Sequence, residues 1–178
     1  MRFRALLSLA IFLSALSVKA YSDDKKEPHI AAVKHAGLYQ FKQLAGEWVG
    51  KEVAGINDGQ PIHVKYKVTA GGSAVVETLF PDSDHEMMTV IHPDGHDLIL
   101  THYCMLGNQP QMKATLKGHD KEIAFKFVRA TNLKSEKEMH MRDAKYIFVD
   151  KDTLKTEWTN YQDGKPGQTV VFELKRKK

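Results

Sequence analysis

The stretch MMTVIHPDGHDLILTHYCM, residues 87–105, carries two apolar segments separated by a turn. Residues 87–91 and 98–105 are both rich in the apolar, β-branched and aromatic side chains that favour strands. The Pro-Asp-Gly sequence between them is typical of a tight turn, because glycine adopts the positive φ that such turns need. We therefore predict an antiparallel β-hairpin here.

The same pattern repeats on both sides of this hairpin. Short segments that alternate apolar and polar side chains each end in turn residues such as Gly, Asp, Asn or Pro. Such a series predicts an all-β fold: an antiparallel up-and-down β-barrel of about ten strands, wide enough to hold one small ligand. The expected strands are residues 47–53, 63–70, 74–80, 87–91, 98–105, 111–116, 123–129, 139–149, 154–161 and 169–175.

We assign residues 46–178 to the barrel, and a helix is expected before it. A proline opens the segment 29–45, in which Leu38 and Phe41 belong to an apolar stripe. Proline is favoured at the first position of a helix. We therefore expect residues 21–45 to contain a leader and one N-terminal helix that covers an end of the barrel.

The first twenty residues, 1–20, have the composition of a secretory signal peptide. Arg2 and Arg4 give a positive start, an apolar run follows, and residues 18–20 form a small-residue cleavage site. The apolar run is shorter than the roughly 20 residues of a membrane span. We predict a secreted or periplasmic protein that begins near Tyr21 and has no membrane anchor.

Charge and cysteine content exclude some classes of protein. The formal charge of +4 includes three basic residues of the signal peptide, and the basic run that remains is the terminal Lys-Arg-Lys-Lys. We therefore expect no nucleic-acid partner. Because Cys104 is the only cysteine, the chain forms no internal disulfide and depends on a hydrophobic core. Composition predicts nothing about the oligomeric state.

The motif Leu-Ala-Gly-Glu-Trp, residues 44–48, resembles the opening signature of the lipocalin and calycin barrels. In that family the glycine allows the turn into the first strand, and the tryptophan plugs the closed end of the barrel. The expected strand number is closer to the fatty-acid-binding and nitrobindin-like branches. The chain also resembles a group of uncharacterised exported bacterial proteins with a calycin-like domain, through stretches such as VETLF, LTHYC, GNQP, MHMRDA and EWTNYQDGKP.

Metal and haem carriage form one hypothesis for the function. Nitrobindin-like proteins hold haem through a histidine late in the chain, whereas the last histidine here is His140 and residues 154–178 contain none. Residues 85–96 are rich in His and Met, a composition that suits copper. The histidines of this segment fall in turns, however, so we expect no metal site and no cofactor.

His102 and Cys104 are separated by one residue, so on a strand both side chains share a face. They are either core packing, part of a ligand pocket, or a reactive pair; with Tyr103 on the other face, we favour the pair pointing inward. Asn108, in the following Gly-Asn-Gln-Pro loop, either builds the turn or hydrogen-bonds a ligand at the rim.

Glu77 lies between apolar residues, and either of two registers is open for it. In one register it faces inward and needs a partner, such as His102, His140 or Arg142; in the other it faces water. His140 and Arg142 themselves share one face of a late strand, with a polar insert, residues 130–138, before it as a surface loop.

The leading functional hypothesis is a barrel that holds a small, largely apolar molecule in its interior, since such pockets are mostly apolar with a few placed polar groups. The alternative is a hydrolase or isomerase that uses Glu77 or His102 as acid–base, with Cys104. The sequence contains none of the common hydrolase, zinc-protease or nucleotide-binding motifs. The candidate ligand-binding residues are Glu77, Met87, His102, Cys104, Asn108, His140 and Trp158.

Overall fold

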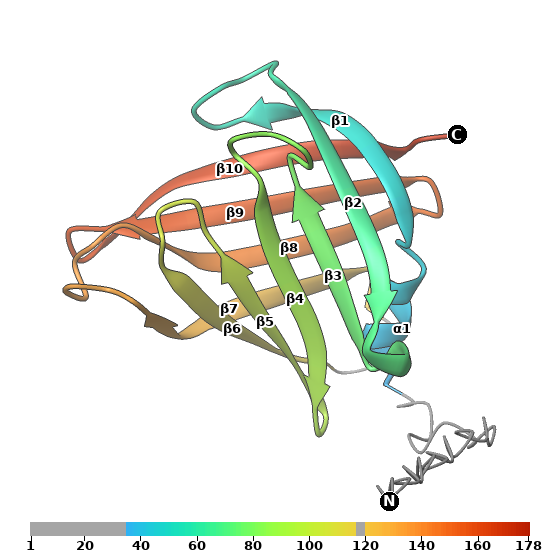
Figure 1. The fold of residues 1–178 in the computed structure, drawn as a ribbon, viewed down its shortest axis with the longest axis horizontal. Coiled ribbons are helices and arrows are strands. Elements are labelled where there is room, and N and C mark those ends of the chain that lie inside the picture. Colours follow the sequence, from blue (N-terminus) through green and yellow to red (C-terminus); the bar gives the residue numbers. More distant parts are fainter. Residues whose placement is uncertain (1–34, 117–119) are drawn as a thin grey trace, which may run out of the picture.

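The computed structural model describes residues 35–116 and 120–178, which form a closed antiparallel β-barrel with one short helix, α1, before the first strand (Figure 1). Each strand pairs with its neighbours in sequence, and the first strand also pairs with the last, as the sequence predicts. The expected signal peptide and the first part of the expected helix lie outside the described residues. The elements are α1 (Ala36–Lys42), β1 (Gly46–Ala54), β2 (Pro61–Thr69), the short 3-10 turn η1 (Ala70–Gly72), β3 (Ala74–Leu79), β4 (Met87–Asp94), β5 (Asp97–Tyr103), β6 (Gln109–Thr115), β7 (Glu122–Thr131), β8 (His140–Asp150), β9 (Thr153–Gln162) and β10 (Lys165–Arg176).

Alternation along the strands produces the two faces of the barrel wall. In β9, Leu154, Thr156 and Trp158 are buried, while the residues between them are only partly covered. A strand places successive side chains on opposite faces, so one set fills the interior and the other meets solvent. α1 adds Leu38 and Phe41 to the interior, and the Phe41 ring contacts Phe125, Tyr146 and Phe148. No helix among the described residues is long and apolar enough to cross a membrane.

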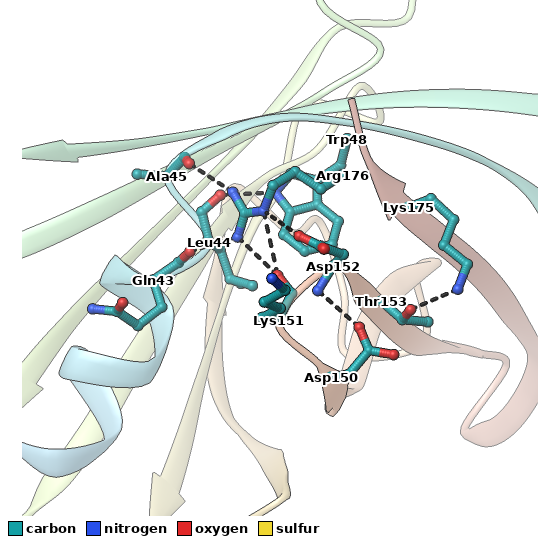
Figure 2. A network of polar contacts seen from close by, with 10 residues as sticks. All are labelled: Gln43, Leu44, Ala45, Trp48, Asp150, Lys151, Asp152, Thr153, Lys175 and Arg176. Atoms are coloured by element: carbon teal, nitrogen blue, oxygen red, sulfur yellow. Dashed lines mark hydrogen bonds and ion pairs between the residues drawn. The ribbon is translucent and has the colours of Figure 1, made fainter. Parts of the chain in front are cut away.

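One end of the barrel, which we call the closed end, is sealed by Trp48 and Arg176 beside α1 (Figure 2). Trp48 is fully buried, and its indole Nε1 donates to the Leu44 carbonyl at 2.7 Å. The Arg176 guanidinium lies 4.4 Å above the indole ring. Its N–H groups donate to carbonyl oxygens of Gln43, Ala45 and Lys151, and Asp152 lies 3.4 Å from its Nε. This contact joins the last strand to the chain segment that enters the first.

The opposite end opens between β7 and β8. These strands pair from Glu122 and Ile147 as far as Lys126 and Asp143. Beyond that point β7 stays paired with β6 and β8 with β9, and residues 132–139 connect the two separated strands. Figure 1 shows this connection on the side of the barrel opposite α1.

A β-bulge stands on each side of this opening. Val128 has no partner on β6, because Gln111 pairs with Arg129 while Met112 pairs with Phe127. Arg142 likewise has no partner on β9, since the register shifts between Met141 and Asp143. Bulges bend a strand and redirect its side chains, so these two explain why the wall separates here.

Candidate functional site

A cleft of about 660 Å³ lies where β7 and β8 separate. We call it the opening cleft. Its walls come from the end of β7, the 132–139 segment, the start of β8 and the β9–β10 turn. The volume falls within the range of about 300–1,000 Å³ that is usual for small-molecule pockets. The residues that matter for its chemistry are Phe127, Arg129, Lys137, His140, Arg142 and Tyr161.

Arg142 lies between two aromatic rings in this cleft. Its guanidinium carbon is 4.0 Å from the centre of the Tyr161 ring and 4.8 Å from that of Phe127. Stacking of this kind covers the faces of the guanidinium and leaves its N–H groups, which lie in its plane, available. No described residue accepts a hydrogen bond from these N–H groups or forms an ion pair with them.

His140 lines the same cleft and is only 1% exposed. Its Nδ1 lies 2.7 Å from the Glu138 carbonyl oxygen, which can only accept, so Nδ1 carries the proton. Nε2 is buried and has no hydrogen-bond partner among the described residues. The ring packs against Phe127 and Tyr161, at 4.9 and 5.6 Å between centroids. His140 and Arg142 therefore lie against the same pair of aromatic rings.

Hydrogen bonds from the β5–β6 turn hold residues 132–139, the segment that lines part of the cleft. Asn108 is buried, and its Nδ2 donates to the Met139 carbonyl at 2.9 Å. In the opposite direction, Nδ2 of Asn132 donates to the Gly107 carbonyl in the turn at 2.6 Å. Asn108 thus positions the chain just before His140, and its buried Oδ1 has no partner within residues 35–116 and 120–178.

The cleft has an excess of positive charge. Arg129, Lys137 and Arg142 line it, against the single carboxylate of Glu136. Arg129 is partly engaged, because its Nε donates to Gln111. Val128, Ala130 and Leu133, with the two aromatic rings, also line the cleft, so it offers apolar surface beside cationic groups.

Glu77 occupies a separate place, the centre of the barrel. It is 1% exposed, which resolves its two registers in favour of the inward one. The hydroxyls of Tyr66 and Tyr146 donate to its two oxygens at 2.6 and 2.8 Å. Burial raises the pKa of Glu77, although these tyrosines and Thr89 act in the opposite direction by hydrogen bonding to the ionised form. Its partners are therefore tyrosines and a threonine rather than a histidine or arginine.

His102 also faces inward, beside this carboxyl. Its Nδ1 lies 3.0 Å from the Thr89 hydroxyl, and its ring is 5.0 Å from that of Trp158. Burial lowers the pKa of His102 from 6.5 to about 4, so the ring is neutral at pH 7. The indole Nε1 of Trp158 is buried without a partner among the described residues. Tyr103, the next residue along β5, is 45% exposed.

Cys104 follows the end of β5 rather than lying within it. Its backbone N–H donates to the Asn108 carbonyl, and its side chain is partly buried. Burial raises the pKa of the thiol, which lowers the fraction of reactive thiolate. Met87, at the start of β4, packs against the core.

The candidate residues thus divide into two groups. Glu77, His102 and Trp158 meet in the interior, whereas His140 lines the opening cleft and Asn108 supports it. The sequence singled out Arg142 as a polar partner but did not indicate Phe127 or Lys137. Within the described ranges, no three His, Cys, Asp or Glu side chains gather closely enough to hold a metal ion.

Comparison with known proteins identifies the fold. No protein-family model matches the chain, and neither does any curated protein sequence. Among solved structures it is similar to Rv2717c from M. tuberculosis, with a TM-score of 0.58 and 16% identity over 79% of this chain and 97% of that one. It is also similar to a DUF3598-family protein with unknown function from Nostoc punctiforme, with a TM-score of 0.53 and 13% identity over 78% of this chain. The match covers 49% of that second protein, and both likenesses concern the fold alone.

Proposed function

We propose that this chain is an exported, calycin-like barrel that binds a small, largely apolar molecule in the opening cleft. The observation that carries the proposal is a cleft of about 660 Å³ lined by His140, whose buried Nε2 has no partner among the described residues, and by the Arg142 guanidinium, which has no acceptor there either. Buried polar groups in folded proteins are nearly always hydrogen-bonded, so unpaired ones beside a cleft favour a ligand or ordered water there. The leader sequence supports export.

The cleft is a better candidate than the centre of the barrel. The side chains around Glu77, including Tyr66, Tyr146 and His102, are at most 2% exposed and belong to or contact the packed core. A ligand there would have to displace aromatic side chains that already contact one another. In the opening cleft the space exists, and apolar side chains such as Leu133 and Ala130 provide a wall for an apolar body.

The alternative function, a hydrolase or isomerase that uses Glu77 or His102 with Cys104, has less support. The Glu77 oxygens are occupied by two tyrosine hydroxyls in a fully buried position. The pKa of the Cys104 thiol is raised by burial, whereas a nucleophilic cysteine needs a lowered one. We therefore propose binding rather than catalysis.

Binding of a neutral fluorescent probe tests the proposal. N-phenylnaphthylamine becomes fluorescent in an apolar site, and we expect saturable binding to the wild-type protein. The variant Ala130→Trp should abolish it by filling the cleft with an indole. Ala124→Trp is the matched control, because Ala124 is exposed on the same strand and does not line the cleft. Equal binding by both variants, or none by the wild type, would refute the proposal.

A further inference from the structure

We infer that the ligand of the opening cleft carries an acidic group, such as a carboxylate, sulfonate or phosphate, and that Arg142 binds it. The inference rests on the proposed function, since it specifies the ligand class for the same cleft. It follows from the state of three groups: the Arg142 guanidinium, the His140 imidazole and the surrounding charges.

The Arg142 guanidinium is held in place but not hydrogen-bonded. Its guanidinium carbon lies over the Phe127 and Tyr161 rings, at 4.8 and 4.0 Å from their centroids, and Arg142 sits at the bulge in β8. A half-buried guanidinium without an acceptor loses hydration that none of the described residues replaces. Its planar N–H groups match the two oxygens of an acidic group, which gives short, charge-assisted hydrogen bonds. The rings also limit its rotamers, so little side-chain entropy is lost on binding.

His140 provides the independent sign that this is a ligand site. It lines the same cleft as Arg142, and its buried Nε2 has no partner among the described residues. Nδ1 is already committed to the Glu138 carbonyl, so the ring cannot turn to satisfy Nε2 without losing that bond. With the proton on Nδ1, Nε2 is a hydrogen-bond acceptor, so a donor elsewhere on the ligand, such as a hydroxyl, would satisfy it while the acidic group binds Arg142.

The remaining charges favour an anion over a cation. Arg129 and Lys137 also line the cleft, and Glu136 is the one acidic residue among its lining residues. Lys137 forms no ion pair or hydrogen bond through its ammonium group within the described part of the chain. A cleft lined by one sign of charge raises the local concentration of the opposite ion. The apolar wall formed by Val128, Ala130 and Leu133 then selects an anion with an apolar body.

Two probes that share a ring system test the inference. Anilinonaphthalene sulfonate carries an acidic group, and N-phenylnaphthylamine is nearly the same molecule without it. We expect the wild type to bind the sulfonate more tightly than the neutral amine. Arg142→Met, which keeps an unbranched apolar side chain between the rings, should weaken sulfonate binding by about tenfold, the loss expected for a charge-assisted contact. Its affinity for the neutral probe should stay within about twofold, since apolar burial is retained.

Lys126→Met is the matched control, since it removes one positive charge from the same strand outside the cleft. It should leave both affinities unchanged. Equal weakening of sulfonate binding by Lys126→Met and Arg142→Met would overturn the inference, because it would show general charge attraction. An unchanged preference for the sulfonate in Arg142→Met would also overturn it. In either case the neutral probe and the Ala130→Trp variant report separately on the proposed function; failure of both probes to bind would sink both proposals.

Discussion

Two arginines stack on aromatic rings at opposite ends of this barrel, and their surroundings differ. Arg176, at the closed end, lies over Trp48 and donates to three backbone carbonyls, with Asp152 beside it (Figure 2). Arg142, at the open end, lies between Phe127 and Tyr161 and has no acceptor among the described residues. Each also borders a cleft, of about 450 Å³ at the closed end and about 660 Å³ at the open end.

The difference shows that a cleft and a stacked arginine do not by themselves indicate a binding site. At the closed end the Arg176 guanidinium joins the last strand to the segment before the first strand. Its hydrogen bonds therefore stabilise the fold. At the open end the neighbouring strands have separated, and no described residue accepts a hydrogen bond from the guanidinium. Hydrogen-bond state, rather than shape, distinguishes the two ends.

The largest effect is expected from the aromatic partners of the two arginines. Trp48→Ala should lower the free energy of unfolding by about 4 kcal/mol, because it empties a fully buried site. Tyr161→Ala should lower it by about 1 kcal/mol, since Tyr161 is only partly buried. Urea denaturation followed by far-UV circular dichroism measures both. Comparable losses for the two variants would mean that the open end contributes as much to the core as the closed end.

A buried histidine away from both ends, His102, gives the next effect, and pH reveals it. Burial lowers the pKa of His102 from 6.5 to about 4, so as the pH falls the unfolded chain binds this proton before the folded chain. Its contribution to stability is therefore complete above pH 6.5 and declines between pH 6.5 and 4, by about 3 kcal/mol in total. His102→Gln should remove this dependence.

The difference between wild type and His102→Gln is the quantity to measure, by urea denaturation at several pH values. The raised pKa of Glu77 acts in the opposite direction, because the folded state keeps that proton to higher pH than the unfolded state. This contribution is common to both proteins and largely cancels. The same pH slope in both would place the neutral state of His102 in doubt.

A direct exchange of each arginine for methionine gives a smaller effect. Arg176→Met should cost about 2 kcal/mol, since it leaves backbone carbonyls of the closed end without donors. Arg142→Met should change stability by less than about 0.5 kcal/mol, because no hydrogen bond is lost within the described protein. Thermal unfolding of the two variants in parallel checks this. A loss for Arg142→Met as large as that for Arg176→Met would show that Arg142 is structural.

The sequence was sufficient to predict the fold, because alternation and turn residues are local signals. Each expected strand overlaps an observed one, and the expected hairpin at residues 87–105 is β4 and β5. Glycine and tryptophan of the first strand also indicated the closed end correctly, since Trp48 fills it. The expected helix is described only from Ala36 and ends at Lys42, before the predicted Ala45.

The open end was harder to predict, because it depends on which strands remain paired. No local pattern marks the loss of pairing after Lys126 and Asp143, nor the bulges at Val128 and Arg142. Without these, His140 and Arg142 are simply a polar face of unknown direction. The inward direction of Glu77 was open for a similar reason: its tyrosine partners come from β2 and β8, far apart in the sequence.

The smallest expected effect is the stabilisation that a bound ligand gives to the wild type and to each arginine variant. It tests the comparison most directly, because only one of the two arginines should contact the ligand. Anilinonaphthalene sulfonate at ten times its dissociation constant should stabilise the wild-type protein by about 1.4 kcal/mol. Arg176→Met should gain the same amount from its lower starting stability, since its binding cleft is intact. Arg142→Met binds about tenfold more weakly, so the same concentration should stabilise it by only about 0.4 kcal/mol. Urea denaturation with and without the probe measures all three. Equal stabilisation of the two variants would mean that the sulfonate does not distinguish the ends, and the contrast between a satisfied and an unsatisfied arginine would then have no functional meaning.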